Sequence, residues 1–318
     1  MPSTRIRLIA PSGYPHDRAA MMRGVARLRD AGCEVEGLET LDRTERRFAG
    51  SDAERAEDIN AFASMPELPD IALVTRGGYG ATRLLPHLRY DALRERLTGA
   101  STLLVGHSDF TALQLALYAK SGLCTFSGPL LADLGAESCS DFTWQGFWDT
   151  LASPASTASW QSSADVDVAG PLWGGNLAVL CSLIGTPYFP LIDDGILFAE
   201  DIGEPPFRVE RLLYQLHLSG VLGRQRALVL GSFSGCEPGL RDNGYDLAAT
   251  FAQIRSIAGI PVVDGMPHGH GDTQLTLPFG ASARLRVAAG QAQLSFSDYP
   301  YLHVRAGGVE QAGPATNP

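Results

Sequence analysis

Short apolar runs alternate with amphipathic segments along the first half of the chain. The predicted strands cover residues 6–10, 34–38, 71–75 and 102–105. The helical periodicity between and after them covers residues 17–31, 51–64 and 110–118. Buried strands that alternate with helices are typical of a parallel sheet covered on both faces. The pattern therefore predicts an α/β fold whose N-terminal domain is a flavodoxin-like, doubly wound parallel sheet.

Three polar or glycine-rich segments follow predicted strands of this sheet. They are Pro-Ser-Gly at 11–13, Arg-Gly-Gly-Tyr-Gly at 76–80 and Gly-His-Ser-Asp at 106–109. Open α/β sheets bind their ligands beyond the carboxyl ends of the strands. We therefore expect the functional site of the N-terminal domain to lie where these three segments meet.

The second half of the chain has a different order of predicted strands and helices. Residues 152–170 are rich in small polar residues without a clear period, which predicts a linker between an N-terminal domain at 1–151 and a C-terminal domain at 171–318. The strands predicted beyond it are 195–200, 227–230, 262–264, 283–288 and 293–296, and the helices are 176–184 and 206–219. We expect a mixed β/α domain that ends in a frayed tail of about ten residues.

Length and charge narrow the classes of function. A chain of 318 residues suits two domains, and 25 basic against 35 acidic residues give a formal charge of −10. This balance argues against nucleic acid or an anionic membrane as the main partner. Five scattered cysteines, no signal sequence and no apolar run of about 18 residues predict a cytoplasmic protein. The only lysine, Lys120, does not follow a phosphate-binding glycine loop.

Ser108 is the most informative single position. It follows a predicted buried strand at a sharp turn and precedes the helical run that begins at Phe110. Such a turn presents a hydroxyl above the sheet and directs the amide of Asp109 toward the oxyanion of an acyl-transfer intermediate. Helix capping by Ser108 or Asp109 explains the same residues without catalysis. The usual G-x-S-x-G motif is not met, because Phe110 occupies its last position.

A serine nucleophile needs a base. His268 and His270 lie in a glycine-rich loop after the strand at 262–264, and either one fits this role. Their spacing also fits a metal site completed by Asp272, although no further ligand lies nearby. His107, next to Ser108, is expected to point to the opposite side of the turn.

The base in turn needs a carboxylate to orient it. Glu200 ends an otherwise apolar predicted strand, where a carboxylate is poorly solvated and needs a partner. Asp201 and Glu204 compete with it, and the residue pattern alone does not separate the three.

Six segments in a fixed order resemble the LD-carboxypeptidase family, which includes muramoyltetrapeptide carboxypeptidases and microcin C immunity peptidases. They are the segments 49–55, 76–80, 106–109, 174–177, 197–201 and 265–270. The resemblance extends from Ile6 to about Val304. It implies a serine peptidase with a Ser-His-Glu triad, no metal or other cofactor, and a homodimeric state.

Matching the motifs assigns roles to individual residues. The resemblance implies that Ser108 is the nucleophile, His270 the base and Glu200 its carboxylate, with an oxyanion hole formed by the amides of Gly78 and Asp109. The implied reaction releases the terminal D-alanine from a murein tetrapeptide during peptidoglycan recycling. The triad draws on both domains, so catalysis requires them to be docked.

Two further residues are candidates for substrate binding. Arg76 lies next to the oxyanion glycines and suits a free C-terminal carboxylate, because a guanidinium binds a carboxylate through two hydrogen bonds. A structural ion pair explains Arg76 equally well. Trp173 is a candidate for lining the pocket, although core packing explains it equally well. Two other functions remain open: an immunity peptidase that cleaves a peptidyl-nucleotide, and a non-catalytic ligand-binding protein in which Ser108 is only a helix cap.

Overall fold

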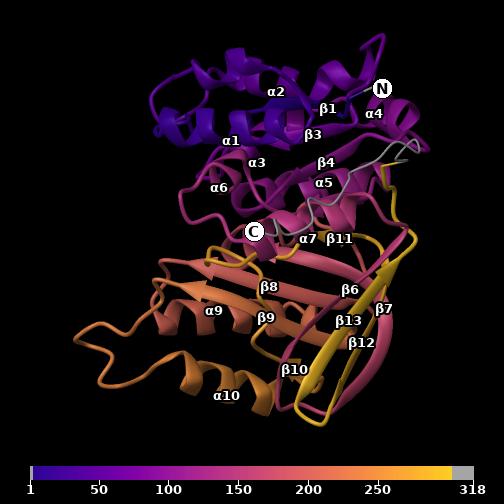
Figure 1. Cartoon of the computed structure of the whole chain (residues 1–318). Coiled ribbons are helices and arrows are strands. Elements are labelled where there is room, and N and C mark those ends of the chain that lie inside the picture. The colour runs from indigo at the N-terminus through magenta and orange to yellow at the C-terminus, as the bar shows by residue number, and fades with distance from the viewer. Residues whose placement is uncertain (1–2, 303–318) are drawn as a thin grey trace, which may run out of the picture.

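The computed structural model describes residues 3–302, which form two lobes, each built on one sheet (Figure 1). The strands of the first sheet, in spatial order, are β11 (Leu277–Phe279), β5 (Thr125–Ser127), β4 (Leu103–Gly106), β3 (Ile71–Val74), β1 (Arg5–Ile9) and β2 (Glu34–Glu36). All neighbours are parallel except β11, which pairs antiparallel with β5. The order β2-β1-β3-β4-β5 is the flavodoxin-like order, which confirms the predicted fold class.

The first lobe contains seven α-helices within residues 3–302. They are α1 (Arg18–Asp30), α2 (Asp52–Asn60), α3 (Ala81–Leu84), α4 (Tyr90–Leu97), α5 (Thr111–Ser121), α6 (Leu131–Leu134) and α7 (Asp141–Leu151). Of these, α1 to α5 lie between the parallel strands, and α6 and α7 follow β5. The apolar face predicted within 17–31 is buried in α1. Ser51 and Glu54 form the capping box that begins α2. Short 3₁₀ segments include η4 (Ser108–Phe110), and the others are η1 (Leu38–Leu41), η2 (Ala61–Ala63), η3 (Leu85–His87) and η5 (Leu222–Arg224).

The second lobe is a seven-stranded mixed sheet with helices. Its strands, in spatial order, are β10 (Val262–Val263), β9 (Ala227–Ser234), β8 (Ile196–Ile202), β7 (Val166–Asn176), β12 (Ser282–Ala288), β13 (Gln291–Ser297) and β6 (Ala155–Gln161). Neighbours from β10 to β7 are parallel, and the remaining pairs are antiparallel. The helices are α8 (Leu177–Ser182), α9 (Pro206–Leu218) and α10 (Leu247–Ile257). The mixed β/α architecture predicted for this half is confirmed.

The segment 152–170 is not a linker. It forms β6 and the first part of β7, and both strands belong to the second sheet. In β6 only Ala158 and Trp160 are buried, and the small polar residues between them face outward. That alternation is the period of a strand with one solvated face, and the abundance of serine concealed it. The predicted tail lies outside the described residues.

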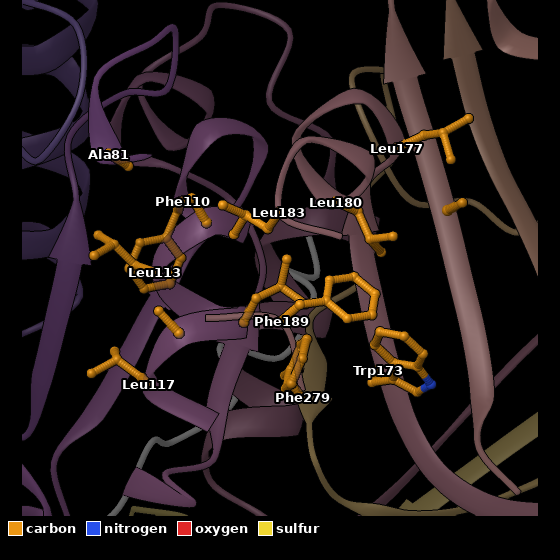
Figure 2. Packing of buried hydrophobic residues seen from close by; sticks show 14 of the residues in the cluster. Ala81, Phe110, Leu113, Leu117, Trp173, Leu177, Leu180, Leu183, Phe189 and Phe279 are labelled. Carbon is orange, nitrogen blue, oxygen red and sulfur yellow. The ribbon is translucent and has the colours of Figure 1, made fainter. Parts of the chain in front are cut away.

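A shared apolar core joins the two lobes (Figure 2). Phe110, just before α5, and Leu113, in its first turn, pack in the same cluster as Leu180 of α8 and Phe189. Burial of large side chains between sheets stabilises their relative position, at roughly 25 cal/mol per Å² of apolar surface. The docking of the lobes is therefore set by packing. In residues 3–302, no helix combines the length and hydropathy needed to cross a membrane.

Candidate active site

Ser108 lies at a strained turn between β4 and α5. Its φ of +62° is in the left-handed region, which residues with a side chain rarely adopt. The strain is typical of a nucleophile held on a strand-to-helix turn. The loop after β3 passes directly against this turn: a Cβ built on Gly77 would lie 2.8 Å from the Ser108 hydroxyl oxygen. Only glycine allows the loop to approach Ser108 so closely.

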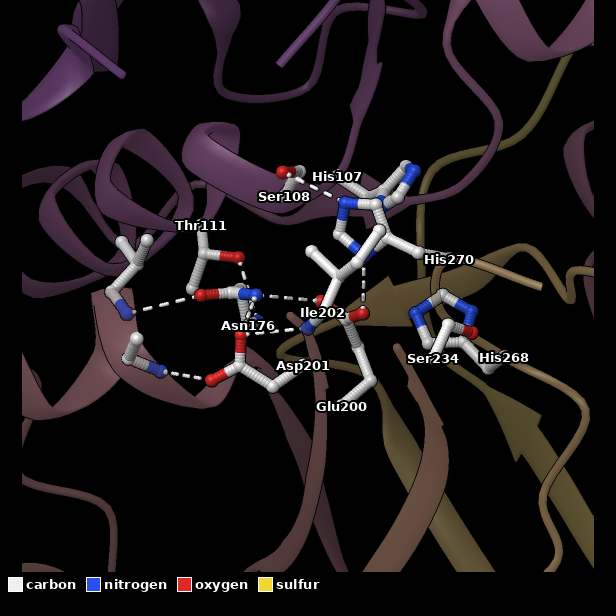
Figure 3. Close-up of polar contacts among 12 residues, drawn as sticks. His107, Ser108, Thr111, Asn176, Glu200, Asp201, Ile202, Ser234, His268 and His270 are labelled. Atoms are coloured by element: carbon white, nitrogen blue, oxygen red, sulfur yellow. Dashed lines mark hydrogen bonds and ion pairs between the residues drawn. The ribbon is translucent and has the colours of Figure 1, made fainter. Parts of the chain in front are cut away.

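A continuous chain of hydrogen bonds links Ser108 to the second lobe (Figure 3). The Oγ of Ser108 is 3.0 Å from Nε2 of His270. The Nδ1 of the same ring is 2.7 Å from Oε2 of Glu200, a buried residue near the carboxyl end of β8. The structure thus brings together the three residues to which the family resemblance assigns the roles of nucleophile, base and carboxylate.

Electrostatics keep this imidazole–carboxylate pair ready for proton transfer. Burial disfavours the charge on Glu200, whose side chain is 1% exposed, but the hydrogen bond and positive charge of His270 outweigh it and lower the pKa of the carboxyl. Burial likewise lowers the pKa of His270, but the hydrogen bond and charge of Glu200 outweigh it, so the net pKa is raised. A carboxylate with a lowered pKa beside an imidazole with a raised pKa favours the imidazolium that forms when the base accepts a proton.

Asn176 holds the carboxylate of Glu200 in place through a hydrogen bond to the oxygen that does not face His270. Its Nδ2 donates to Glu200 at 3.2 Å and to Asp201 at 2.9 Å, and its Oδ1 caps α8. Its backbone N–H donates to the hydroxyl of Thr111, one turn beyond the nucleophile, at 3.0 Å. Burial, with the charge of Glu200 adding to it, raises the pKa of Asp201 to about 6. The same asparagine therefore fixes the acid and joins it to the nucleophile's helix.

Gly269 allows the base to reach its carboxylate. Its φ is +125°, and a Cβ at this position would lie 2.8 Å from Cβ of Glu200. The loop can bring His270 over the end of β8 only because position 269 lacks a side chain.

The other two candidate histidines have distinct surroundings. His268 is fully buried, with Nδ1 3.0 Å from the carbonyl of Leu275 and Nε2 3.1 Å from the hydroxyl of Ser127. Burial lowers the pKa of His268 to about 4, so the ring is neutral. It does not share a metal site with His270, because both of its nitrogens have partners elsewhere.

His107 lies beside His270, which corrects the expectation that it points to the opposite side of the turn. The two ring centroids are 4.6 Å apart. The backbone of His107 is extended, with φ −148°, and its ring is held by the carboxylate of Asp133. Nitrogen and carboxylate atoms of His107, Glu200 and His270 lie within 4.8 Å of one another, but each side chain is already engaged in a hydrogen bond, and we do not identify them as metal ligands.

The remaining candidates fall in different places. Asp109 is buried, and its carboxylate accepts a hydrogen bond from the Ala81 N–H at 2.8 Å, which ties the nucleophile turn to the loop that carries Gly78. Arg76 is half-buried beside that loop, and its guanidinium donates to the carbonyl of Tyr14. Trp173 does not line the site. It is fully buried in the core, where its indole N–H donates to Gln225, so the structure favours the packing role for this residue.

Comparison with known proteins agrees with this geometry. Residues 6–128 match the LD-carboxypeptidase N-terminal domain, and residues 169–285 match the LD-carboxypeptidase C-terminal domain. The chain is 33% identical over 304 residues to the murein tetrapeptide carboxypeptidase of Pseudomonas aeruginosa, an alignment that covers 88% of this chain and 92% of the relative. The chain belongs to the LD-carboxypeptidase family. The family assignment confirms the resemblance found in the motifs.

Two further relatives illustrate the breadth of the LD-carboxypeptidase family. The crystal structure of muramoyltetrapeptide carboxypeptidase from Oxalobacter formigenes superimposes with a TM-score of 0.86 at 44% identity, covering 93% of this chain and 100% of that one. The microcin C7 self-immunity protein MccF of Escherichia coli is 29% identical over 292 residues, covering 81% of this chain and 83% of the relative. The chain is thus a serine-type peptidase of a family with both kinds of member.

Sequence reasoning missed two residues of this site. The first is Asn176, which the motif at 174–177 contained but to which no role was given. A polar side chain between a glycine pair and an apolar helix signals a helix cap, and this one also binds the acid. The second is Asp133, the partner of His107, whose surrounding sequence carries no signal of a site.

Proposed function

We propose that this protein is an LD-carboxypeptidase that releases the terminal D-alanine from murein tetrapeptide during peptidoglycan recycling. The observation that carries the proposal is the hydrogen-bonded chain Ser108–His270–Glu200 across the two lobes. The relatives named murein tetrapeptide carboxypeptidase and muramoyltetrapeptide carboxypeptidase, at 33% and 44% identity, supply the substrate class.

The reaction follows from the positions of the three side chains. Ser108 attacks the carbonyl carbon between the L-centre of the diamino acid and D-alanine, while Nε2 of His270 accepts its proton. Glu200 holds the Nδ1–H tautomer and stabilises the imidazolium. His270 then protonates the leaving amine of D-alanine, and water, deprotonated by the same imidazole, releases the acyl group. The amides of Asp109 and Gly78 are our candidates for stabilising the oxyanion, and the close passage of Gly77 against Ser108 supports them.

We assign recognition of the free C-terminal carboxylate to Arg76. No carboxylate lies within ion-pair distance of this guanidinium in the described part of the chain. Burial lowers the pKa of Arg76, and the neighbouring cation Arg47 lowers it further. A half-buried cation without a counter-charge, on the loop that passes Ser108, is suited to bind an anionic group of a ligand.

The principal competing substrate is a peptidyl-nucleotide, as the relationship to MccF suggests. An aromatic surface that stacks on the base would favour this substrate, and Trp173 was the sequence's candidate for it. Because Trp173 is enclosed in the core, it is not available to stack on a base, and the higher identity to the carboxypeptidases favours the murein peptide. A non-catalytic binding role leaves the Ser108–His270–Glu200 chain without an explanation.

We extend the proposal to the setting of the enzyme, a cytoplasmic homodimer. All five cysteines are free thiols, as is usual in a reducing compartment. Light scattering coupled to gel filtration measures the mass of the assembly, and a mass near 34 kDa instead of twice that value contradicts the dimer.

The decisive experiment supplies murein tetrapeptide and measures free D-alanine. We expect release by the wild type, none above background by Ser108→Ala, and a raised KM with little change in kcat for Arg76→Ala, because uniform binding is lost. A parallel reaction contains a peptidyl-nucleotide. Cleavage of that compound without release of D-alanine moves the assignment to an immunity peptidase, and turnover of neither by the wild type refutes both.

A further inference from the structure

A second imidazole–carboxylate pair borders the base. Nε2 of His107 lies 3.3 Å from Oδ2 of Asp133, and its ring meets that of His270 at an interplanar angle of 62°, with centroids 4.6 Å apart. Figure 3 shows His107 and His270 next to each other beside Ser108. Asp133 belongs to α6 and also accepts a hydrogen bond from the Leu130 N–H at 2.9 Å. The contacts therefore run from the carboxylate of Asp133 to the ring of His107 and on to the ring of His270.

Packing alone does not explain why a histidine occupies position 107. His107 is 3% exposed, and its Nδ1 is buried without a hydrogen-bond partner among residues 3–302. A buried polar atom without a partner is destabilising, so phenylalanine would fill the same volume at a lower cost. Asp133, in contrast, keeps 38% of its side chain exposed. Because the costly imidazole faces the base on one side and a carboxylate on the other, its neighbours point to a function in catalysis.

We propose that His107 is a positioning residue for His270, and that Asp133 acts through it as a second negative charge on the base. The inference rests on the function proposed above. Contact with His107 restricts rotation of the His270 ring, so Nε2 stays directed at Ser108. When the Ser108 proton moves to Nε2, the imidazolium is attracted by Asp133 as well as by Glu200. No proton moves to His107, which keeps its hydrogen bond to Asp133.

Several elements present charged or titratable groups to these two rings. They are Glu200 and Asp201 on β8, Asp133 on α6, and His268 in the loop after β10. Burial lowers the pKa of His270, but Glu200 and then Asp133 outweigh it. Burial also disfavours the charge on Asp133, yet the hydrogen bond and charge of His107 leave the pKa of that carboxyl lowered. Asp133 is therefore charged at neutral pH and favours protonation of His270.

Three variants and one control test the proposal. Asp133→Asn removes the charge but keeps the shape of the side chain, so the acid limb of the kcat/KM profile should move to lower pH by about 0.5 to 1. His107→Phe keeps a ring against His270 but loses the bond to Asp133, and kcat should fall about tenfold at unchanged KM. The double variant should lose little more than the worse single variant, since both break one unit. Asp141→Asn removes an exposed carboxylate of α7 and should match the wild type.

A readout without substrate separates this inference from the proposed function. The imidazole protons of His270, followed by NMR, should titrate at lower pH in Asp133→Asn than in the wild type or in Asp141→Asn. This shift can be measured even if murein tetrapeptide is not cleaved. An unchanged titration of His270 overturns the role of Asp133, and additive losses in the double variant overturn the positioning role of His107. A purely structural pair lowers the melting temperature of both single variants without moving the titration.

Discussion

Replacing Glu200 with glutamine tests the central geometry without adding or removing bulk. Asn176 donates to Oε1 of Glu200 and the ring of His270 donates to Oε2. In Glu200→Gln, the amide oxygen must stay toward the Asn176 donor, so its NH₂ group faces Nδ1 of His270. The ring then carries its proton on Nε2, which faces Ser108, and cannot accept the serine proton.

The expected loss follows from two contributions. A carboxylate about 4 Å from an imidazolium at an effective dielectric constant of about 20 stabilises it by about 4 kcal/mol, which corresponds to about a thousandfold in rate. The wrong tautomer adds to this loss, so kcat for D-alanine release should fall by about 10³ to 10⁴. Unfolding in urea should show little loss of stability, because a buried charge is removed and the volume is kept.

The matched control is Glu204→Gln. Glu204 lies four residues farther along the chain and forms only a partly exposed ion pair with Arg208, at 3.2 Å. Its replacement should leave kcat within about twofold of the wild type, because partly exposed pairs contribute little. The reasoning is refuted if Glu200→Gln retains a tenth or more of the wild-type kcat, or if the control loses as much as Glu200→Gln does.

Three further predictions concern stability and pH. Gly269→Ala forces a side chain into the left-handed region and against Glu200, so we expect a loss of about 1–3 kcal/mol in unfolding free energy and a much lower kcat; an active, equally stable variant contradicts this. Asn176→Ala removes a helix cap and the amide shared by two buried carboxylates, and urea denaturation should show a loss of about 3–5 kcal/mol, with less than 1 kcal/mol arguing against the role. The pKa of His270 is raised above 6.5 in the folded state, so its stabilising contribution is complete below pH 6.5 and disappears as pH rises through the raised value. The stability advantage of the wild type over His270→Gln should therefore shrink as the pH rises above 6.5, and a constant difference disproves the linkage.

Much of the fold could be predicted from local pattern. The continuous apolar runs at 71–75 and 102–105 became β3 and β4, because strands buried on both faces carry no polar alternation. The segment 152–170 was misjudged because its outward residues are serine and threonine, types shared by loops and exposed strand faces. The strand β11 could not be assigned to the first sheet from sequence, since its partner β5 lies about 150 residues earlier.

The residues of the site also differ in how far local sequence predicts them. The position of Ser108 after a buried strand is a local signal, and its left-handed φ agrees with the expected turn. The distinction between His268 and His270 is not local, because both lie in one loop. It depends on Ser127 and on the carbonyl of Leu275, which engage the first ring and leave the second to face Glu200. Family motifs identified His270 only because they summarise such long-range contacts.

The loop that carries His270 is anchored in both sheets. It leaves β10 in the second sheet and continues into β11, which is hydrogen-bonded at the edge of the first. Any movement of one lobe away from the other must extend the segment between β10 and β11. The distance between His270 and Ser108 therefore depends on how the two lobes are packed together. A chain that has folded only its first 270 residues lacks the edge strand that closes this link. Peptidase activity should consequently arise late in folding, which limits hydrolysis by incompletely folded molecules.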